Sequence, residues 1–210
     1  MSAPRTVTVG TDRLHRWIDG FADRHGPFEP SLTRTEVTLL ARDGSSAVIE
    51  VPFPPLEGTR LTDLLVHVRR ARRVGVLLVR RGGYAAGVFA GAALESSKVG
   101  SSYVQGTTKA GGWSQQRFAR RRANQASAAF AEAADIAVRI LAAADIEALV
   151  VGGDKEAVRS VLADRRVAHL QSLVTGPWLN VKDPKLRILA AMPGQFLTVR
   201  IAVTDSEGGA

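Results

Sequence analysis

The order of apolar and polar positions predicts a chain of alternating helices and strands. The segment "TDRLHRWIDGFADR" (11–24) has apolar residues at helical spacing, which predicts a helix with Thr11 or Asp12 at its N-cap. Two runs rich in β-branched and apolar residues follow at 35–42 and 46–52, and "DGSS" joins them. This arrangement predicts a β-hairpin.

The middle of the chain is more apolar and predicts buried strands. "LTDLLVHVRRA" (61–71) places its leucines on one face and predicts a short helix, after a proline-rich loop at 52–58. "RVGVLLVR" (73–80) predicts a buried strand, and after the turn "RGGY" we expect a second strand at 85–94. A further strand at 101–107 would lead into a glycine-rich loop.

The longest predicted element is a helix over residues 115–144. Small and apolar side chains recur along it at helical spacing, so they form one continuous stripe that can lie close against a sheet. The stripe consists of Ala119, Ala123, Ala126, Phe130, Ala133, Ala137, Ile140 and Ala144. The opposite face begins with a polar and basic group, which consists of Arg117, Arg120, Arg121 and Asn124.

The C-terminal part continues the α/β order. "IEALVVGGDKEAVRSVLA" (146–163) predicts a strand, a Gly-Gly turn and a helix with Asp154 at its N-cap. Such a junction can bind phosphate, but this one lacks Gly-x-Gly-x-x-Gly and a P-loop lysine, which favours an ordinary turn. Beyond it we expect Trp178 in the core, a helix at 183–192 and an edge strand at 196–203.

Composition restricts the possible chemistry. With 210 residues, 45% hydrophobic and 23% charged, the chain suits one globular domain, or one domain with a small appendage. It has no cysteine, which excludes disulfides and thiolate zinc sites and suits a reducing cytoplasm. The histidines show no metal-ligand spacing, and no apolar run is long enough to span a membrane, so we expect no metal, no cofactor and no membrane.

The placement of charge adds more than the net value of +8. No acidic residue occurs between Glu95 and Glu132, and this gap holds only positive charges. They are Lys98, Lys109, Arg117, Arg120, Arg121 and Arg122. An acid-free basic block around a glycine loop is expected of a protein that binds a polyphosphate such as RNA. The alternative is a solvated charged face.

Few residues offer covalent or metal chemistry. There is no Gly-x-Ser-x-Gly motif, and no histidine is near Ser114 in the sequence. The carboxylates Asp63, Glu95 and Asp154 could form a metal-nuclease cluster, but their spacing does not single them out. The glycine loop is the better candidate, because glycines allow close approach to a ligand and a glutamine can orient water or an oxyanion without titrating.

The segment "YVQGTTKAGGWSQQRFARRRANQ" (103–125) resembles the catalytic segment of the Vms-like release factors, in a bacterial, actinobacterial branch. These proteins are related to the middle domain of the eukaryotic class-1 peptide release factor. Lys109 followed by Gly111-Gly112, a glutamine and a basic helix follows the family pattern. The likeness extends over about 35–200 and implies a ribonuclease-H-like α/β domain with a mixed sheet, flanking helices and one long Ala-rich helix after the loop.

The resemblance implies a peptidyl-tRNA hydrolase that frees nascent chains on stalled ribosomes through a Gly-x-x-Gln loop in the peptidyl-transferase centre. Its partners would be the large ribosomal subunit, ribosomal RNA and peptidyl-tRNA. The catalytic group would consist of Gly111, Gly112 and Gln115. The RNA-binding group would consist of Lys109, Trp113, Arg117, Arg120, Arg121 and Arg122. Alternatives on the same complexes are cleavage of the tRNA near its 3′ end and RNA binding without catalysis.

The chain also departs from the family pattern. Trp113 and Ser114 separate the glycines from the glutamines, so Gln115 and Gln116 are both candidates, and the Gly-x-x-Gln spacing favours Gln115. The zinc finger, ankyrin-type repeats and partner-binding tail of eukaryotic Vms-like proteins are not found, so ribosome docking is expected from the core domain. We expect a helical segment at 1–30 packed on the core, the catalytic domain at 31–204 and a frayed tail at 205–210.

Overall fold

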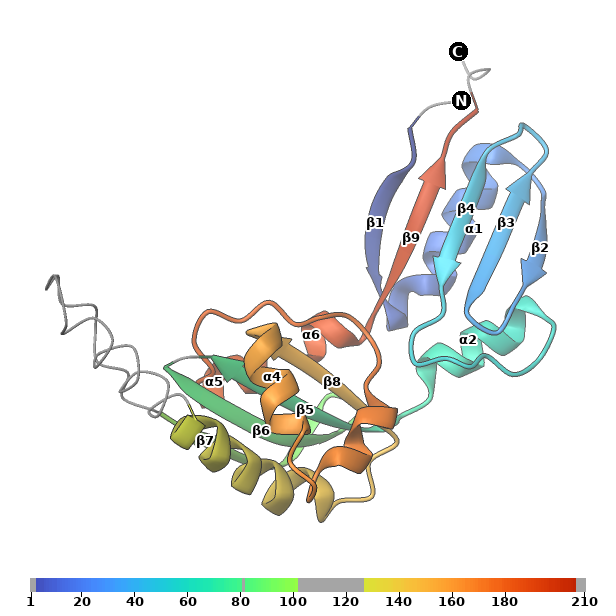
Figure 1. Cartoon of the computed structure of the whole chain (residues 1–210). Coiled ribbons are helices and arrows are strands. Elements are labelled where there is room, and N and C mark those ends of the chain that lie inside the picture. The colour runs from blue at the N-terminus through green and yellow to red at the C-terminus, as the bar shows by residue number, and fades with distance from the viewer. Residues whose placement is uncertain (1–2, 81, 102–126, 207–210) are drawn as a thin grey trace, which may run out of the picture. The chain divides into compact units, whose positions relative to one another are not determined.

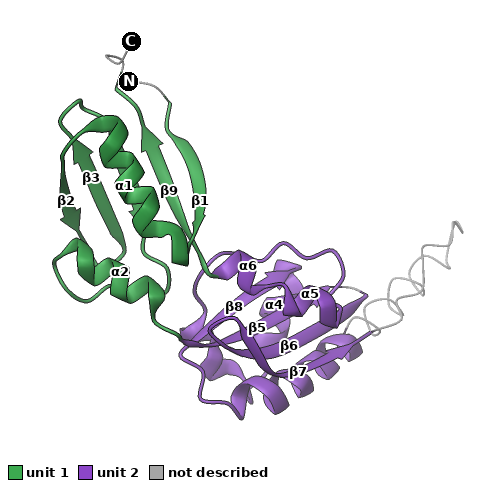
Figure 2. Ribbon diagram, turned by 180° about the vertical axis from the view of Figure 1, so that it is seen from behind, with its two compact units in different colours: residues 1–71, 197–210 green, residues 72–196 purple. Residues whose placement is uncertain are grey.

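A computed structural model describes residues 3–80, 82–101 and 127–206 (Figure 1). The predicted α/β class is confirmed, since helices flank two separate β-sheets. Each sheet belongs to its own compact unit (Figure 2). Unit 1 contains residues 1–71 and 197–210, and unit 2 contains residues 72–196.

Unit 1 is an antiparallel sheet with two helices packed on one face. Its strands lie in the order β1-β9-β4-β3-β2. They are β1 (Arg5–Gly10), β2 (Phe28–Leu32), β3 (Glu36–Ala41), β4 (Ser46–Glu50) and β9 (Thr198–Thr204). After a single turn, η1 (Thr11–Arg13), comes α1 (Leu14–His25), and α2 (Leu61–Arg69) follows β4. Alternate residues of β3, β4 and β9 are buried against Leu14, Ile18 and Phe21 of α1 and Leu64 and Val68 of α2.

Unit 1 differs from the sequence-based expectation in its strands. The predicted hairpin and the helix at 61–71 are confirmed, but β1 and β2 were not predicted. The expected edge strand is instead β9, which lies between β1 and β4. The boundary between the two units lies after residue 71 and not after residue 30. Residues 197–210 belong to the first unit, because β9 completes the N-terminal sheet.

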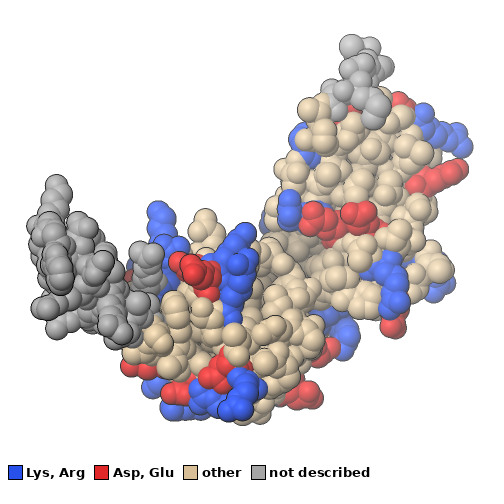
Figure 3. Space-filling view, in the orientation of Figure 1, with Lys and Arg blue, Asp and Glu red and all other residues tan. Residues whose placement is uncertain are grey.

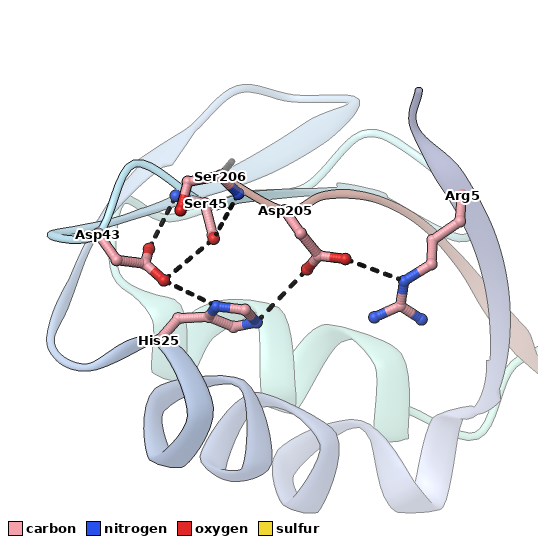
Figure 4. A network of polar contacts seen from close by, with 6 residues as sticks. All are labelled: Arg5, His25, Asp43, Ser45, Asp205 and Ser206. Carbon is pink, nitrogen blue, oxygen red and sulfur yellow. Dashed lines mark hydrogen bonds and ion pairs between the residues drawn. The ribbon is translucent and has the colours of Figure 1, made fainter. Parts of the chain in front are cut away.

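A polar network joins the end of α1, the β3–β4 turn and the segment after β9 (Figure 4). His25 Nδ1 lies 2.9 Å from Asp43 Oδ2, and its Nε2 lies 3.6 Å from Asp205 Oδ1. Asp205 also pairs with Arg5. The Ser45 backbone N–H and the His25 ring bond to Asp43 and lower the pKa of its carboxyl. Asp205, expected in a frayed tail, is therefore fixed by side-chain contacts.

Unit 2 contains a mixed sheet in the order β7-β6-β5-β8. Its strands are β5 (Arg73–Arg80), β6 (Gly83–Ala90), β7 (Ala93–Gly100) and β8 (Ala148–Gly153). β8 is parallel to β5, and the other neighbours are antiparallel. One face packs against a helix over 127–137, η2 (Val138–Ala142), α4 (Lys155–Leu162) and η3 (Ala168–Leu173). On the other face Phe89 contacts Phe196, near the short helices α5 (Leu186–Ala190) and α6 (Pro193–Phe196).

The described part of the long predicted helix is helical from 127 to 142, with a π-helical last turn. Residues 115–126 of that helix and 102–107 of the predicted strand lie outside the described residues. The strand expected at 85–94 is instead the end of β6 and the start of β7. The chain turns between them at Gly91, whose φ of 58° a glycine adopts without strain.

Candidate functional site

The structure fixes the two ends of the segment that carries the predicted site. All nine predicted site residues lie outside the described part of the chain. They are Lys109, Gly111, Gly112, Trp113, Gln115, Arg117, Arg120, Arg121 and Arg122. The chain leaves the described part after Ser101, directly beyond β7, and returns at residue 127 in a helix. The surroundings of these two ends therefore define the site as far as the structure describes it.

The first end lies where three strands of unit 2 terminate. β7, β5 and β8 run in the same direction, so their C-terminal ends share one edge of the sheet. In register across this edge are Gly100 of β7, Tyr84 of β6, Val79 of β5 and Gly153 of β8. We call it the C-terminal edge. Segment 102–126 therefore begins at the C-terminal edge.

Tyr84 connects the two ends of this segment. Its ring packs so closely on Gly100 that a Cβ atom there would lie 2.2 Å from Tyr84 Cε2. Its hydroxyl donates a 2.7 Å hydrogen bond to Glu132 Oε2, on the helix that follows the segment. Burial, together with this bond to a carboxylate, raises the pKa of Tyr84 to about 12, so the hydroxyl stays protonated at neutral pH. Sequence reasoning did not identify Tyr84 or Glu132.

The same helix has a second polar attachment. Arg166 lies between Asp135 and Asp164, with 2.7 Å contacts to a carboxylate oxygen of each. These bonds from Arg166 lower the pKa of Asp164 to about 2. All three side chains reach solvent, so the network adds little to stability. It links the helix to the segment after α4.

Trp178, expected in the core, is instead 40% exposed. Its indole Nε1 donates a 3.1 Å hydrogen bond to the carbonyl of Gly153, at the end of β8. Lys155 Nζ lies 5.7 Å from the ring centroid. The predicted N-cap is confirmed here, since Asp154 accepts hydrogen bonds from two backbone N–H groups of α4, whereas the two glycines expected in a turn are the last residues of β8. An aromatic ring and a cation thus lie at the C-terminal edge.

The three carboxylates weighed for a metal site each have a structural partner. Asp63 accepts backbone N–H groups before α2, Asp154 caps α4, and Glu95 pairs with Arg73. Within residues 3–80, 82–101 and 127–206, no group of three or more histidine, cysteine or acidic residues is placed to hold a metal ion. In the same residues, no helix is long and apolar enough to cross a membrane.

Comparison with protein families identifies the chain. The sequence model of the Actinobacteria/chloroflexi VLRF1 release factor matches residues 72–202. The chain belongs to this family. The match covers unit 2 in full and continues into β9. The resemblance to Vms-like release factors is thereby confirmed.

Two of the solved structures to which the chain is similar are archaeal proteins. The archaeal translation termination factor aRF1 has 16% identity and a TM-score of 0.40, over 73% of this chain and 48% of that one. Pelota from Archaeoglobus fulgidus has 12% identity and a TM-score of 0.34, over 92% of this chain and 63% of that one. This VLRF1 chain thus spans less than two thirds of either protein. No curated protein sequence is similar enough to count as a match.

Proposed function

We propose that this protein is a peptidyl-tRNA hydrolase that frees nascent chains from tRNA on stalled ribosomes or large subunits. The VLRF1 match over residues 72–202 is the observation that carries the proposal. It spans the whole segment that holds the glycine pair, the glutamines and the arginines. The place of action would be the peptidyl-transferase centre, in the cytoplasm, with no metal or cofactor.

The proposed chemistry is hydrolysis of the ester between peptide and tRNA. Water attacks the ester carbonyl, the bond from this carbon to the ribose oxygen breaks, and a proton passes to that oxygen. Gln115 would orient the water or the oxyanion, because an amide offers a donor and an acceptor without titrating. Gly111 and Gly112 would let the backbone approach the ester. Catalysis of this kind acts through positioning and oxyanion stabilisation.

Binding would come from the basic residues around the glycines. Lys109, Arg117 and the run Arg120-Arg121-Arg122 would contact phosphates of ribosomal RNA or the tRNA 3′ end, and Trp113 would stack on a base. Phosphate contacts supply affinity but do not depend on the reacting ester. The proposal therefore separates the binding residues from Gln115.

The two described ends of the segment support catalysis by positioning. A catalytic group that acts by position needs fixed attachment points. Tyr84 provides contacts to both, through its ring on Gly100 and its hydroxyl on Glu132. Neither residue would touch the ester, so their part would be to hold the ends of the segment.

The decisive experiment incubates the full chain with large subunits that carry peptidyl-tRNA. Hydrolysis yields free peptide and tRNA of full length. Cleavage of the tRNA near its 3′ end yields peptide attached to a short RNA fragment and a shortened tRNA. Binding without chemistry leaves the peptidyl-tRNA unchanged. Only the first result agrees with the proposed function.

A further inference from the structure

We propose that Trp178, with Arg80 and Lys155 beside it, forms a second RNA-binding site in unit 2, which stacks on an unpaired nucleotide of large-subunit ribosomal RNA. This group of three residues is called the Trp178 site. The proposal rests on the proposed function only for the choice of ribosomal RNA. The case for a nucleotide ligand comes from the described residues themselves.

Trp178 is both rigid and exposed. The following residue pairs with β8, since Leu179 N–H donates to Val151 O at 2.9 Å and Gly153 N–H donates to Leu179 O at 3.2 Å. The indole N–H is bonded to the Gly153 carbonyl at 3.1 Å. The side chain is nevertheless 40% exposed. An aromatic ring held in this way loses little conformational freedom when a base stacks on it.

Lys155 lies over the ring of Trp178, and Arg80 lies close to Gly153, whose carbonyl accepts the indole hydrogen bond. Lys155 Nζ lies 5.7 Å from the ring centroid. Gly153 lies so close to Arg80 that a Cβ on that glycine would be 3.2 Å from Arg80 Cδ. Both side chains are exposed, and neither forms an ion pair with another described residue. On the upper side of unit 2 in Figure 3, lysines and arginines stand on both sides of a group of acidic side chains.

Three acidic residues, Asp154, Glu156 and Asp183, lie near Lys155 or Trp178 in the sequence. Asp154 is occupied by the backbone of α4, and Asp183 pairs with Lys185 at 2.8 Å. Glu156 is an exposed acidic residue in the first turn of α4. An exposed aromatic ring with a lysine over it and an exposed arginine nearby fits a ligand with flat bases and phosphates, and unpaired RNA has both. An acidic peptide would use the cations but not the ring face.

The chain that follows Trp178 leads toward the start of segment 102–126. It reaches Pro184, whose Cγ would lie 3.6 Å from a Cβ at Gly83. That same Cβ would lie 2.8 Å from the carbonyl oxygen of Gly100. Lys182, in this connection, is exposed.

The spacing favours ribosomal RNA over the tRNA 3′ end. β7 and β8 are the outer strands of a four-stranded sheet, so three strand spacings, roughly 14 Å, separate Gly100 from Gly153. The proposed function places the tRNA 3′ end at segment 102–126, which begins after β7. The Trp178 site, beside β8, would then contact a different RNA strand. The proposed function supplies large-subunit RNA as that second strand.

The test measures binding of the full chain to a fluorescent single-stranded decauridylate by anisotropy at several salt concentrations. Trp178→Leu keeps apolar bulk but removes the aromatic face, and we expect its Kd to rise roughly 5- to 150-fold. Its salt dependence should match the wild type. Trp178→Phe keeps an aromatic face but lacks the indole N–H that bonds to Gly153. It should retain most of the affinity, which would show that stacking and not the hydrogen bond supports binding.

Charge and position are tested in parallel. Lys155→Ala and Arg80→Ala should each reduce the slope of log affinity against log salt by about 0.7, the value for one phosphate of a single strand. Trp17→Leu is the matched control, because Trp17 is a half-buried tryptophan that stacks on Phe21 in unit 1. It should bind decauridylate like the wild type. Thermal unfolding verifies that each variant is folded.

A second comparison identifies the source of the RNA. Trp178→Leu should weaken binding to tRNA-free large subunits by a similar factor and leave binding to deacylated tRNA unchanged. The inference is overturned if Trp178→Leu binds decauridylate as tightly as the wild type, or if it loses affinity for tRNA rather than for subunits. None of these measurements needs peptide release. A protein that binds RNA through Trp178 but releases no peptide would therefore contradict the proposed function alone.

Discussion

The hydroxyl of Tyr84 donates a 2.7 Å hydrogen bond to the carboxylate of Glu132, across 48 positions of the sequence. The bond joins β6 to the helix that follows segment 102–126. The ring of Tyr84 is almost fully buried and lies against Gly100, the last residue of β7. One side chain therefore contacts the elements at both ends of the segment that carries the predicted catalytic residues.

Tyr84→Phe should reveal this bond through the pH dependence of stability. The pKa of Tyr84 is about 12 in the folded protein and 10.0 in the unfolded chain. Because the folded value is raised, its stabilisation is complete below pH 10 and is lost as pH rises to 12. Denaturant titrations at pH 8 and pH 11 should show a larger loss for the wild type than for Tyr84→Phe. Tyr103, the other tyrosine, is present in both proteins and cancels.

At pH 8 the same substitution should cost about 1.5 kcal/mol, the low end for a bond to a charged group, because Glu132 is exposed and can hydrate when unpaired. A double-mutant cycle with Glu132→Ala tests the pairing. The free energy of unfolding of the double variant should lie within a few tenths of a kcal/mol of that of Tyr84→Phe. Fully additive losses would show that the two residues act separately.

Gly100→Ala should disturb the first end of the segment. The new Cβ would lie 2.2 Å from Tyr84 Cε2, and the buried ring has little space to retreat. We expect a loss of about 1–3 kcal/mol, as for other overpacked sites. Gly82→Ala is the control, since no atom lies within 4 Å of a Cβ at that position. Urea unfolding measures both. In a Tyr84→Ala background most of the Gly100→Ala cost should vanish, and an unchanged cost would contradict the contact.

The predictable parts of the fold are those with local signals. Asp154 was predicted as an N-cap because it follows a glycine pair and precedes an amphipathic run, and the hairpin of β3 and β4 has a turn sequence between two apolar runs. β1 was missed because it is a strand only through pairing with β9, at the other end of the chain. The exposed position of Trp178 was missed as well. Its indole bonds to Gly153, 25 positions away, and the local sequence gives no sign of this contact.

The candidate site divides in the same manner. Its proposed chemical residues rest on the glycine pair, the amides and the run of arginines, all within one short stretch of sequence. Their supporting residues were not found, because Tyr84 and Glu132 meet only in the folded unit. Neither carries a motif, and a tyrosine in an apolar strand reads as an ordinary core residue.

Arg120→Ala with Arg121→Ala should weaken binding to large subunits and reduce its salt dependence. Each lost phosphate contact lowers the slope of log affinity against log salt by about one. Filter binding at 50 to 200 mM salt measures this slope. Arg16→Ala is a suitable control, since Arg16 is an exposed arginine of α1 in unit 1. If the double variant keeps both the affinity and the slope of the wild type, the arginines form only a solvated face.

Gln115→Ala should abolish peptide release and leave subunit binding nearly unchanged. An uncharged amide adds little to an affinity dominated by phosphate contacts, whereas loss of one positioned donor typically lowers a rate by about 100-fold or more. Gln116→Ala is the matched control with the same chemical change one position later. If both residues begin the predicted helix, their side chains point about 100° apart, so both cannot face one ester.

Single-turnover release at saturating protein distinguishes the outcomes. Gly112→Ala should resemble Gln115→Ala if the backbone there needs a positive φ, which alanine disfavours. A dead Gln116→Ala with an active Gln115→Ala would move the catalytic amide by one residue and keep the mechanism. Wild-type rates for both single variants and for the double variant would show that no glutamine takes part. The arginine variants would then retain their effect on binding, because phosphate contacts do not depend on the amide.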